Sequence, residues 1–309
     1  MSESTPTPAF KASHASRMVT LSLHAFTQLV RMKVFYFLAV FAVIVIGSNF
    51  FDMAQHQGPE SVGANVLRNI ESWSLGAMAL FAVVISIVAT ALLLPRDIED
   101  RTLYTVLAKP VPRIDYLVGR LMGVLLLVFV SLAVMDLLMV AALHLRTGMV
   151  MEMQEKMAVG RGWPEEAIQS LKQETLASGV NWQLQAAVLA IFLKVAVMAA
   201  ICLSVSTFST STLFTTVVSF LIFFIGHFQA DALDFYLKGV EAGTSTFSQY
   251  LALGFSLFIP NFQLFNVVDG LVQNQPITLL MVGKLVMMAC YYVLLYTLLA
   301  WWIFSDKEV

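Results

Sequence analysis

The chain has 309 residues, of which 59% are hydrophobic and only 12% are charged, and its formal net charge is −2. Soluble domains carry about 25% charged residues, so this composition excludes an ordinary water-soluble enzyme or binding domain. The near-neutral charge gives no indication of nucleic-acid binding, which needs a strongly basic surface. We therefore expect an integral membrane protein.

The first element that the sequence predicts is an amphipathic helix within residues 17–33. Apolar residues such as Leu21, Phe26 and Leu29 alternate there with basic and polar ones, a pattern typical of a helix that lies along the inner membrane surface. This stretch is not expected to be a secretory signal, because the first apolar run begins only at Val34. We interpret residues 1–33 as a cytoplasmic N-terminus with an interfacial helix.

Residues 34–309 contain six apolar runs, each near or above the length of about 20 residues that a membrane-spanning helix needs. None shows the two-residue alternation of a barrel strand, so we expect an all-α, polytopic membrane protein with six transmembrane helices. The fourth and fifth runs are close in sequence and are expected to pack as antiparallel neighbours. The six runs are Val34–Phe51, Trp73–Leu94, Leu121–Leu145, Leu184–Thr207, Leu213–Ala230 and Ile277–Phe304.

The segments between the runs indicate how the chain is oriented. Lys and Arg are more numerous on the side that would be cytoplasmic if both termini were inside, which is the arrangement that the positive-inside rule favours. Residues 146–183 then form a long outer loop, and residues 231–276 form a second outer region. Within that region Phe247–Ile259 is too short to span the membrane, and we interpret it as interfacial or re-entrant.

The most informative segment is the cytoplasmic loop 95–120. Its apolar residues recur at nearly helical spacing among many charges, with acids such as Glu99 near the start and Lys109 near the end, before Pro110. This pattern predicts a short amphipathic helix at the membrane surface, whose exposed face is free to dock a soluble partner.

Parts of this loop carry a resemblance to a known family. The chain contains the segments Glu99-Asp-Arg-Thr-Leu, Leu107-Ala-Lys-Pro-Val-Pro-Arg113 and Gly119-Arg-Leu-Met-Gly123, with Tyr116 between the last two. Together these segments resemble the permease subunits of type-2 ATP-binding-cassette (ABC) exporters. Within that family the likeness is greatest to the group called multicopper-enzyme-maturation permeases.

The resemblance implies a half-transporter in the bacterial plasma (inner) membrane. It would pair with a second permease copy or a homologous permease and bind separate ABC ATPase subunits on the cytoplasmic side. ATP and Mg would belong to those partner subunits, and this chain would hold no cofactor of its own. The loop would be the coupling helix, and the coupling residues that the resemblance implies are Glu99, Arg101, Thr102, Leu103, Leu107, Lys109, Pro110, Arg113 and Tyr116.

We expect no catalytic site in this chain. The phosphate-binding loop G-x-x-x-x-G-K-[ST] is missing from the sequence, since Gly283-Lys284 lacks both the upstream glycine and the following Ser or Thr. The sequence also lacks the serine-hydrolase elbow and the zinc-protease His pair. ATP hydrolysis by this chain alone is therefore not expected.

Two ionisable residues, Asp136 and Lys194, fall inside predicted spans, where a charge costs at least about 2.5–3.5 kcal/mol unless it finds a partner or water. Counted from Leu121 and Thr207, they lie at similar depths of about 23 Å and 20 Å. The sequence therefore predicts that they can meet as an intramembrane polar pair. Such a pair would either tie two spans together or line a substrate or proton path.

Two further patterns have both an ordinary and a functional interpretation. Met149, Met153 and Met157 would share one helix face and are a weak candidate for a soft metal such as Cu(I), although a Met-rich amphipathic turn is the ordinary interpretation. Gly119 and Gly123 would let two helices approach closely, or would simply make the entry to the third span flexible.

Two other functions stay open from the sequence. A secondary transporter would couple transport through Asp136 and Lys194 and would need no ATPase. A membrane anchor would dock an ATPase complex through the same loop without transporting anything. The sequence does not identify the substrate.

Overall fold

The computed structural model describes residues 14–33, 59–99, 112–177, 179–209, 211–238, 258–267 and 277–306, together with single positions between 36 and 47 and at 254 and 270. All regular structure in these residues is helical, which confirms the all-α fold class. The elements are α1 (His14–Val30), α3 (Pro59–Glu99), α5 (Arg113–Gly160), α6 (Glu165–Ala177), α7 (Trp182–Phe208), α8 (Thr212–Lys238), the 3₁₀-helix η3 (Phe262–Phe265) and α11 (Leu279–Ser305).

Five helices in the described part of the chain are long and apolar enough to cross a membrane, namely α3, α5, α7, α8 and α11. They correspond to five of the six predicted spans, so the protein is membrane-embedded. The remaining predicted span, Val34–Phe51, lies outside the described residues apart from a few single positions, each of them helical.

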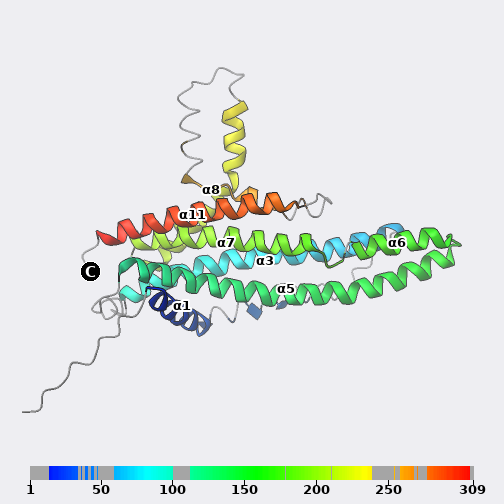
Figure 1. The fold of residues 1–309 in the computed structure, drawn as a ribbon, viewed down its shortest axis with the longest axis horizontal. Coiled ribbons are helices and arrows are strands. Elements are labelled where there is room, and N and C mark those ends of the chain that lie inside the picture. Colours follow the sequence, from blue (N-terminus) through cyan, green and yellow to red (C-terminus); the bar gives the residue numbers. More distant parts are fainter. Residues whose placement is uncertain are drawn as a thin grey trace, which may run out of the picture.

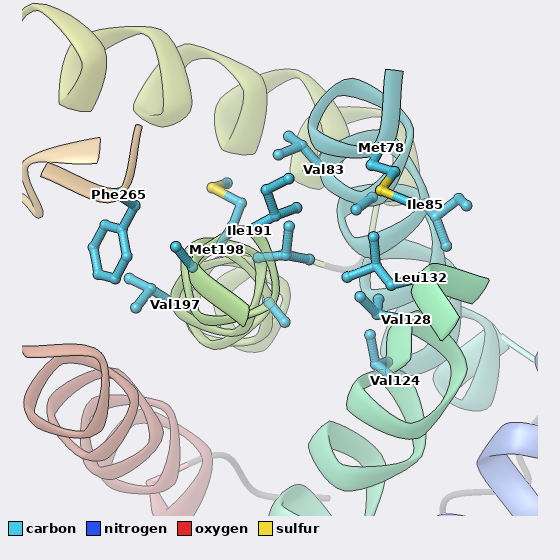
Figure 2. Close-up of a cluster of buried hydrophobic side chains, with 14 of the residues drawn as sticks. Met78, Val83, Ile85, Val124, Val128, Leu132, Ile191, Val197, Met198 and Phe265 are labelled. Carbon is cyan, nitrogen blue, oxygen red and sulfur yellow. The ribbon is translucent and has the colours of Figure 1, made fainter. Parts of the chain in front are cut away.

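Four of these helices run along the long axis of the molecule with α7 in the middle (Figure 1). α7 packs against α3, α5, α8 and α11, and most of its side chains are buried. Figure 2 shows Ile191 of α7 pointing toward Val83 of α3, and Leu132 of α5 belongs to the same buried cluster. The core therefore lies around α7 rather than between two layers.

The outward faces of the bundle are as apolar as its core. On α8, Leu213 and Phe224 are exposed, whereas Thr215 and Ser219 on the same helix are fully buried. This distribution is the reverse of that in a water-soluble bundle. It suits a bilayer, because lipid tails are as apolar as leucine and small residues allow helices to pack closely.

Exposed tryptophans mark the two ends of the membrane-embedded region. Trp182 begins α7, while Trp301 and Trp302 lie near the end of α11, and the two helices run in the same direction (Figure 1). Along α11, Trp301 is 22 residues beyond Leu279, so the helix extends about 33 Å before it reaches this tryptophan. That length is enough to cross a hydrocarbon core of about 30 Å and to place Trp301 and Trp302 at an interface. We call the end with Trp301 the inner end, following the predicted orientation, and the end with Trp182 the outer end.

α5 is much longer than the membrane is thick. Its 48 residues extend about 72 Å, more than twice the hydrocarbon thickness. Its second half packs with α6 and the start of α3 beyond the outer end of α7 (Figure 1). The predicted outer loop 146–183 is thus mostly helical, and we call this part the outer extension.

One buried hydrogen bond and one surface ion pair hold the outer extension together. The Thr175 hydroxyl donates a hydrogen bond of 2.8 Å to the side-chain oxygen of Gln154, and both side chains are buried. On the surface, Lys172 of α6 forms a 2.9 Å ion pair with Glu155 of α5. The buried hydrogen bond contributes more to stability, because an exposed ion pair is worth only about 0–1 kcal/mol.

The connection between α3 and α5 is shorter than the predicted loop 95–120. α3 continues past Pro95 to Glu99, and α5 already begins at Arg113. Pro112 precedes α5 with extended backbone angles, and Asp115 lies in the first helical turn, where a carboxylate is favoured by the helix dipole. These local signals start the helix eight residues before the apolar run at Leu121.

The fourth and fifth spans are neighbours, as expected, but they do not run antiparallel to each other. α8 follows α7 after three residues, yet it crosses α7 and α3 steeply (Figures 1 and 2). Ser209 has extended backbone angles of −108° and 142°, and the Ser211 hydroxyl accepts a hydrogen bond from the Phe214 amide at the start of α8. The link therefore redirects the chain instead of folding it back along α7.

Candidate functional site

At the inner end, Arg113 connects the first turn of α5 to the last turn of α11. Its guanidinium Nη1 donates hydrogen bonds to the carbonyl oxygens of Phe304 at 2.8 Å and Ser305 at 2.6 Å. These carbonyls have no partner within their own helix, and a cation at a helix C-terminus is also favoured by the helix dipole. Arg113 therefore caps α11 from a different helix.

Tyr116 forms the centre of this contact. Its side chain is fully buried and stacks on the Phe304 ring with a centroid distance of 6.2 Å. The Arg120 guanidinium lies 5.4 Å from the centroid of the Tyr116 ring, and its Nη1 donates a 2.9 Å hydrogen bond to Gln28 of α1. Three helices thus meet here, and we call these contacts of α1, α5 and α11 the inner junction.

α1 lies directly on the two glycines of α5. A Cβ atom placed on Gly123 would be 2.5 Å from the Cβ of Ala25 and 2.8 Å from the backbone oxygen of Ser22. One placed on Gly119 would be 2.6 Å from the Cβ of Leu21. The helix that the glycine pair accommodates is therefore α1 of the same chain.

A buried carboxylate adds a polar contact to the same interface. Asp115 is almost fully buried, and its Oδ2 lies 2.9 Å from Nδ1 of the exposed His14 at the start of α1. The backbone groups at the start of α5 also favour a negative charge at this position. The inner end of α5 is thus fixed to α1 by both close packing and a polar contact.

The predicted coupling residues are only partly placed by the structure. Arg113 and Tyr116 belong to the inner junction, and Tyr116 is buried, so it holds helices together and offers no surface to a docked protein. Glu99 is the last residue of α3. The rest lie outside the described residues, namely Arg101, Thr102, Leu103, Leu107, Lys109 and Pro110.

Asp136 and Lys194 do not form the predicted pair. The Asp136 carboxylate instead accepts a 3.2 Å hydrogen bond from the side-chain nitrogen of Gln185 on α7. Lys194 lies nine residues further along α7, about 13 Å away. The reason is the early start of α5 at Arg113, since counting depth from Leu121 placed Asp136 about eight residues too close to the inner end.

Lys194 lies near the middle of α7, about 18 Å from Trp182 and 21 Å from Phe208 along the helix. Its side chain is only 7% exposed. The ammonium nitrogen is 3.5 Å from Nε2 of His227 and 5.3 Å from the centroid of the Phe223 ring, both on α8. Among the described residues, no carboxylate lies within ion-pair distance of it. Sequence reasoning missed His227, although a polar residue inside an apolar span was an available signal.

Irregular backbone lies next to this lysine. Residues 258–267 include η3, and Phe262 of η3 is buried against Phe223 with a ring-centroid distance of 5.5 Å. Gly226 of α8 leaves room for this approach, because a Cβ there would be 2.6 Å from the Phe262 ring. On the other side, the Tyr296 hydroxyl of α11 donates a 2.6 Å hydrogen bond to the carbonyl of Phe258.

This segment packs at the depth of the central part of α7, and Figure 2 shows Phe265 beside Val197. Non-helical backbone occurs at such depth only where protein buries it or where it lines a cavity. We call Lys194, Phe223, His227 and Phe262 the Lys194 site. The site combines a lysine near the middle of α7 with a neighbouring segment of non-helical backbone.

The methionines of the outer extension lie on a continuous stretch of α5. Met149 and Met153 are exposed, and the helical spacing of the three residues places them and Met157 along one face, as predicted. No group of three or more His, Cys, Asp or Glu in the described residues is arranged to hold a metal ion. A soft-metal site on the three thioethers stays a prediction, because that arrangement concerns other ligand types than methionine.

Comparison with known proteins does not assign the chain to a family. No protein-family model matches it, and no curated protein matches it either.

Proposed function

We propose that this chain is the transmembrane permease subunit of an ATP-driven ABC exporter in the bacterial plasma (inner) membrane, with both termini in the cytoplasm. ABC ATPase subunits would bind on the cytoplasmic side, and a second permease copy or a homologous permease would complete the transporter. The ATPases would contribute ATP and Mg. Besides the motif in the loop, the proposal is carried by one structural observation, the inner junction.

The inner junction supports this proposal because α5 begins directly after the charged segment 100–111 in the sequence. A force on that segment would reach the start of α5, and Arg113 and Tyr116 fix that point to α11. The close packing of α1 on Gly123 adds a third helix to the same unit. Docking and release of an ATPase would therefore move three helices together rather than one loop.

The test is co-purification of the detergent-solubilised chain with ABC ATPases from the same organism. We would compare the wild type with the double variant Glu99→Ala/Arg101→Ala, and measure the bound ATPase and its rate of ATP hydrolysis. A matched control is Arg161→Ala/Glu165→Ala, which removes the same charge types from the outer extension. We expect the wild type and the control to bind and stimulate the ATPase, and the loop variant to lose both.

Two results would overturn the proposal. One is a wild-type chain that binds none of the ATPases, and the other is a loop variant that binds as well as the control. A secondary transporter built on a pair of Asp136 and Lys194 has less support, because the structure does not bring these residues together. It would become the better explanation if transport persisted without any ATPase.

A further inference from the structure

We propose that the Lys194 site binds the anionic head group of an amphiphilic molecule, a lipid or a lipid-like compound with at least one phosphate or carboxylate group. The claim that this molecule is the cargo of the transporter rests on the proposed function. The claim that the site binds such a molecule does not. The argument starts from how poorly the charge of Lys194 is satisfied in the structure.

A lysine ammonium group has three hydrogen-bond donors. Here it has one nitrogen acceptor at 3.5 Å, beyond the usual 2.7–3.2 Å range, and one aromatic ring face at 5.3 Å. The ring contributes a modest attraction to the cation, and a neutral histidine contributes no opposite charge. Lys194 therefore lies deep in the membrane with most of its capacity to bind an anion unused.

Two aspartates on helices that pack against α7 are bound to other side chains and form no ion pair with Lys194. Asp136 is bound to Gln185 about 13 Å along α7, and Asp231 on α8 accepts a 3.2 Å hydrogen bond from the side chain of Gln263. An ionised side chain at this depth is costly, and chains that keep one use it where ligands or ions pass. An oxygen anion would be a stronger acceptor than the histidine, because it adds the attraction of an opposite charge, which is strong where water is excluded.

The surroundings of the lysine indicate that the rest of the ligand is apolar. Phe223 and Phe262 form the apolar part of the site, and the adjoining face of α8 exposes Phe224 and Phe228. α8 crosses α7 steeply, so the two helices are in contact over a short stretch only (Figure 2). A molecule with an acyl or similar chain could lie along this exposed face while its head group reaches Lys194, whose long stem can extend toward it.

The experiment is native mass spectrometry of the purified, detergent-solubilised chain titrated with phosphatidylglycerol or with phosphatidylcholine of identical acyl chains. The variants are Lys194→Met, which removes the charge, and Lys194→Arg, which keeps it. The matched control is Lys284→Met, which removes an exposed lysine from α11. A further arm adds glycerol phosphate, which has the anionic group but no acyl chains.

We expect the wild type to bind phosphatidylglycerol at least tenfold more tightly than phosphatidylcholine. Lys194→Met should abolish this preference, whereas Lys194→Arg and Lys284→Met should retain it. Glycerol phosphate should not displace the lipid at equal concentration. The proposal fails if Lys194→Met keeps the preference or if Lys194→Arg loses it as completely as Lys194→Met. It also fails if glycerol phosphate competes as well as the lipid, because the ligand would then be a small anion. None of these readouts depends on an ATPase, so they are separate from the test of the proposed function.

Discussion

The contact between α1 and Gly123 gives the sharpest prediction about stability. Gly123→Ala places a Cβ atom 2.5 Å from the Cβ of Ala25 and 2.8 Å from the backbone oxygen of Ser22. Non-bonded carbon atoms do not approach each other so closely. A backbone oxygen also cannot move away by a change of rotamer, as the end of a long side chain can. The substitution must therefore push α1 away from α5.

The magnitude follows from two opposing effects. Overpacking a close contact costs about 1–3 kcal/mol. Replacing glycine by alanine inside a helix returns about 0.5–1 kcal/mol, because alanine is the better helix former. The net expectation is a loss of up to about 2.5 kcal/mol in the free energy of unfolding, with a central value of about 1 kcal/mol, which corresponds to a decrease of a few degrees in the unfolding midpoint.

The assay compares two alanine substitutions on the same helix. Gly148→Ala introduces the same methyl group at a position with no neighbour within 4 Å, so it should be neutral or slightly stabilising. Thermal unfolding in detergent gives the midpoints, and trypsin cleavage within α1 reports whether that helix has separated from α5. The second change Ala25→Gly removes one of the two close contacts but itself costs helix stability, so its effect should appear as reduced trypsin cleavage of α1 relative to Gly123→Ala alone rather than as a restored midpoint.

The reasoning is refuted if Gly123→Ala and Gly148→Ala behave alike in both measurements. It is also refuted if Gly123→Ala lowers the midpoint but leaves cleavage of α1 unchanged. In that case the methyl group would be disturbing something other than the contact with α1. The glycine pair would then need a different partner.

Three further predictions concern other contacts. Thr175→Val removes the hydroxyl that binds buried Gln154 and should cost about 1–3 kcal/mol, seen as faster hydrogen exchange in α6, while Thr175→Ser should be close to the wild type. Arg113→Gln should speed hydrogen exchange in the last turn of α11, because two carbonyls lose a charged donor; equal exchange in both proteins would contradict this role. Gly226→Ala should lower the unfolding midpoint, since its Cβ would meet the Phe262 ring and the Pro260 carbonyl within 3 Å, whereas Gly283→Ala, with no neighbour within 4 Å, should not.

The helical character and the locations of the long helices could be predicted from the sequence, because runs of apolar residues have few stable alternatives in a bilayer. The residues at which these helices begin and end could not be predicted in the same way. α5 begins at Arg113 and ends at Gly160, well outside the apolar run 121–145, since no proline interrupts this stretch and its polar ends can be helical in water. Because the start of α5 was predicted at Leu121 instead of Arg113, Asp136 was also misplaced relative to Lys194. The predicted polar pair depended on this one helix boundary.

The Lys194 site shows a different limit. Lys194 was recognisable as a charge in an apolar span, but its neighbours come from α8, which follows after a short link, and from η3, about 70 residues away in the sequence. Spacing along the chain does not indicate that a helix will cross its predecessor instead of running beside it. Gly226 was the only local signal for the close approach of the segment containing Phe262, and a glycine in an apolar helix has several ordinary explanations.

The length of α5 decides how the proposed coupling would act at a distance. The helix is continuous from the inner junction to the outer extension, and long helices without proline bend only gently. A tilt of about 5° around its inner end would move its outer end by about 6 Å, given a rise of 1.5 Å per residue. α6 would move with it, because the buried contact between Thr175 and Gln154 joins the two helices. In the proposed function a small displacement beside the inner junction is therefore enough to rearrange the outer extension, without any flexible element between them.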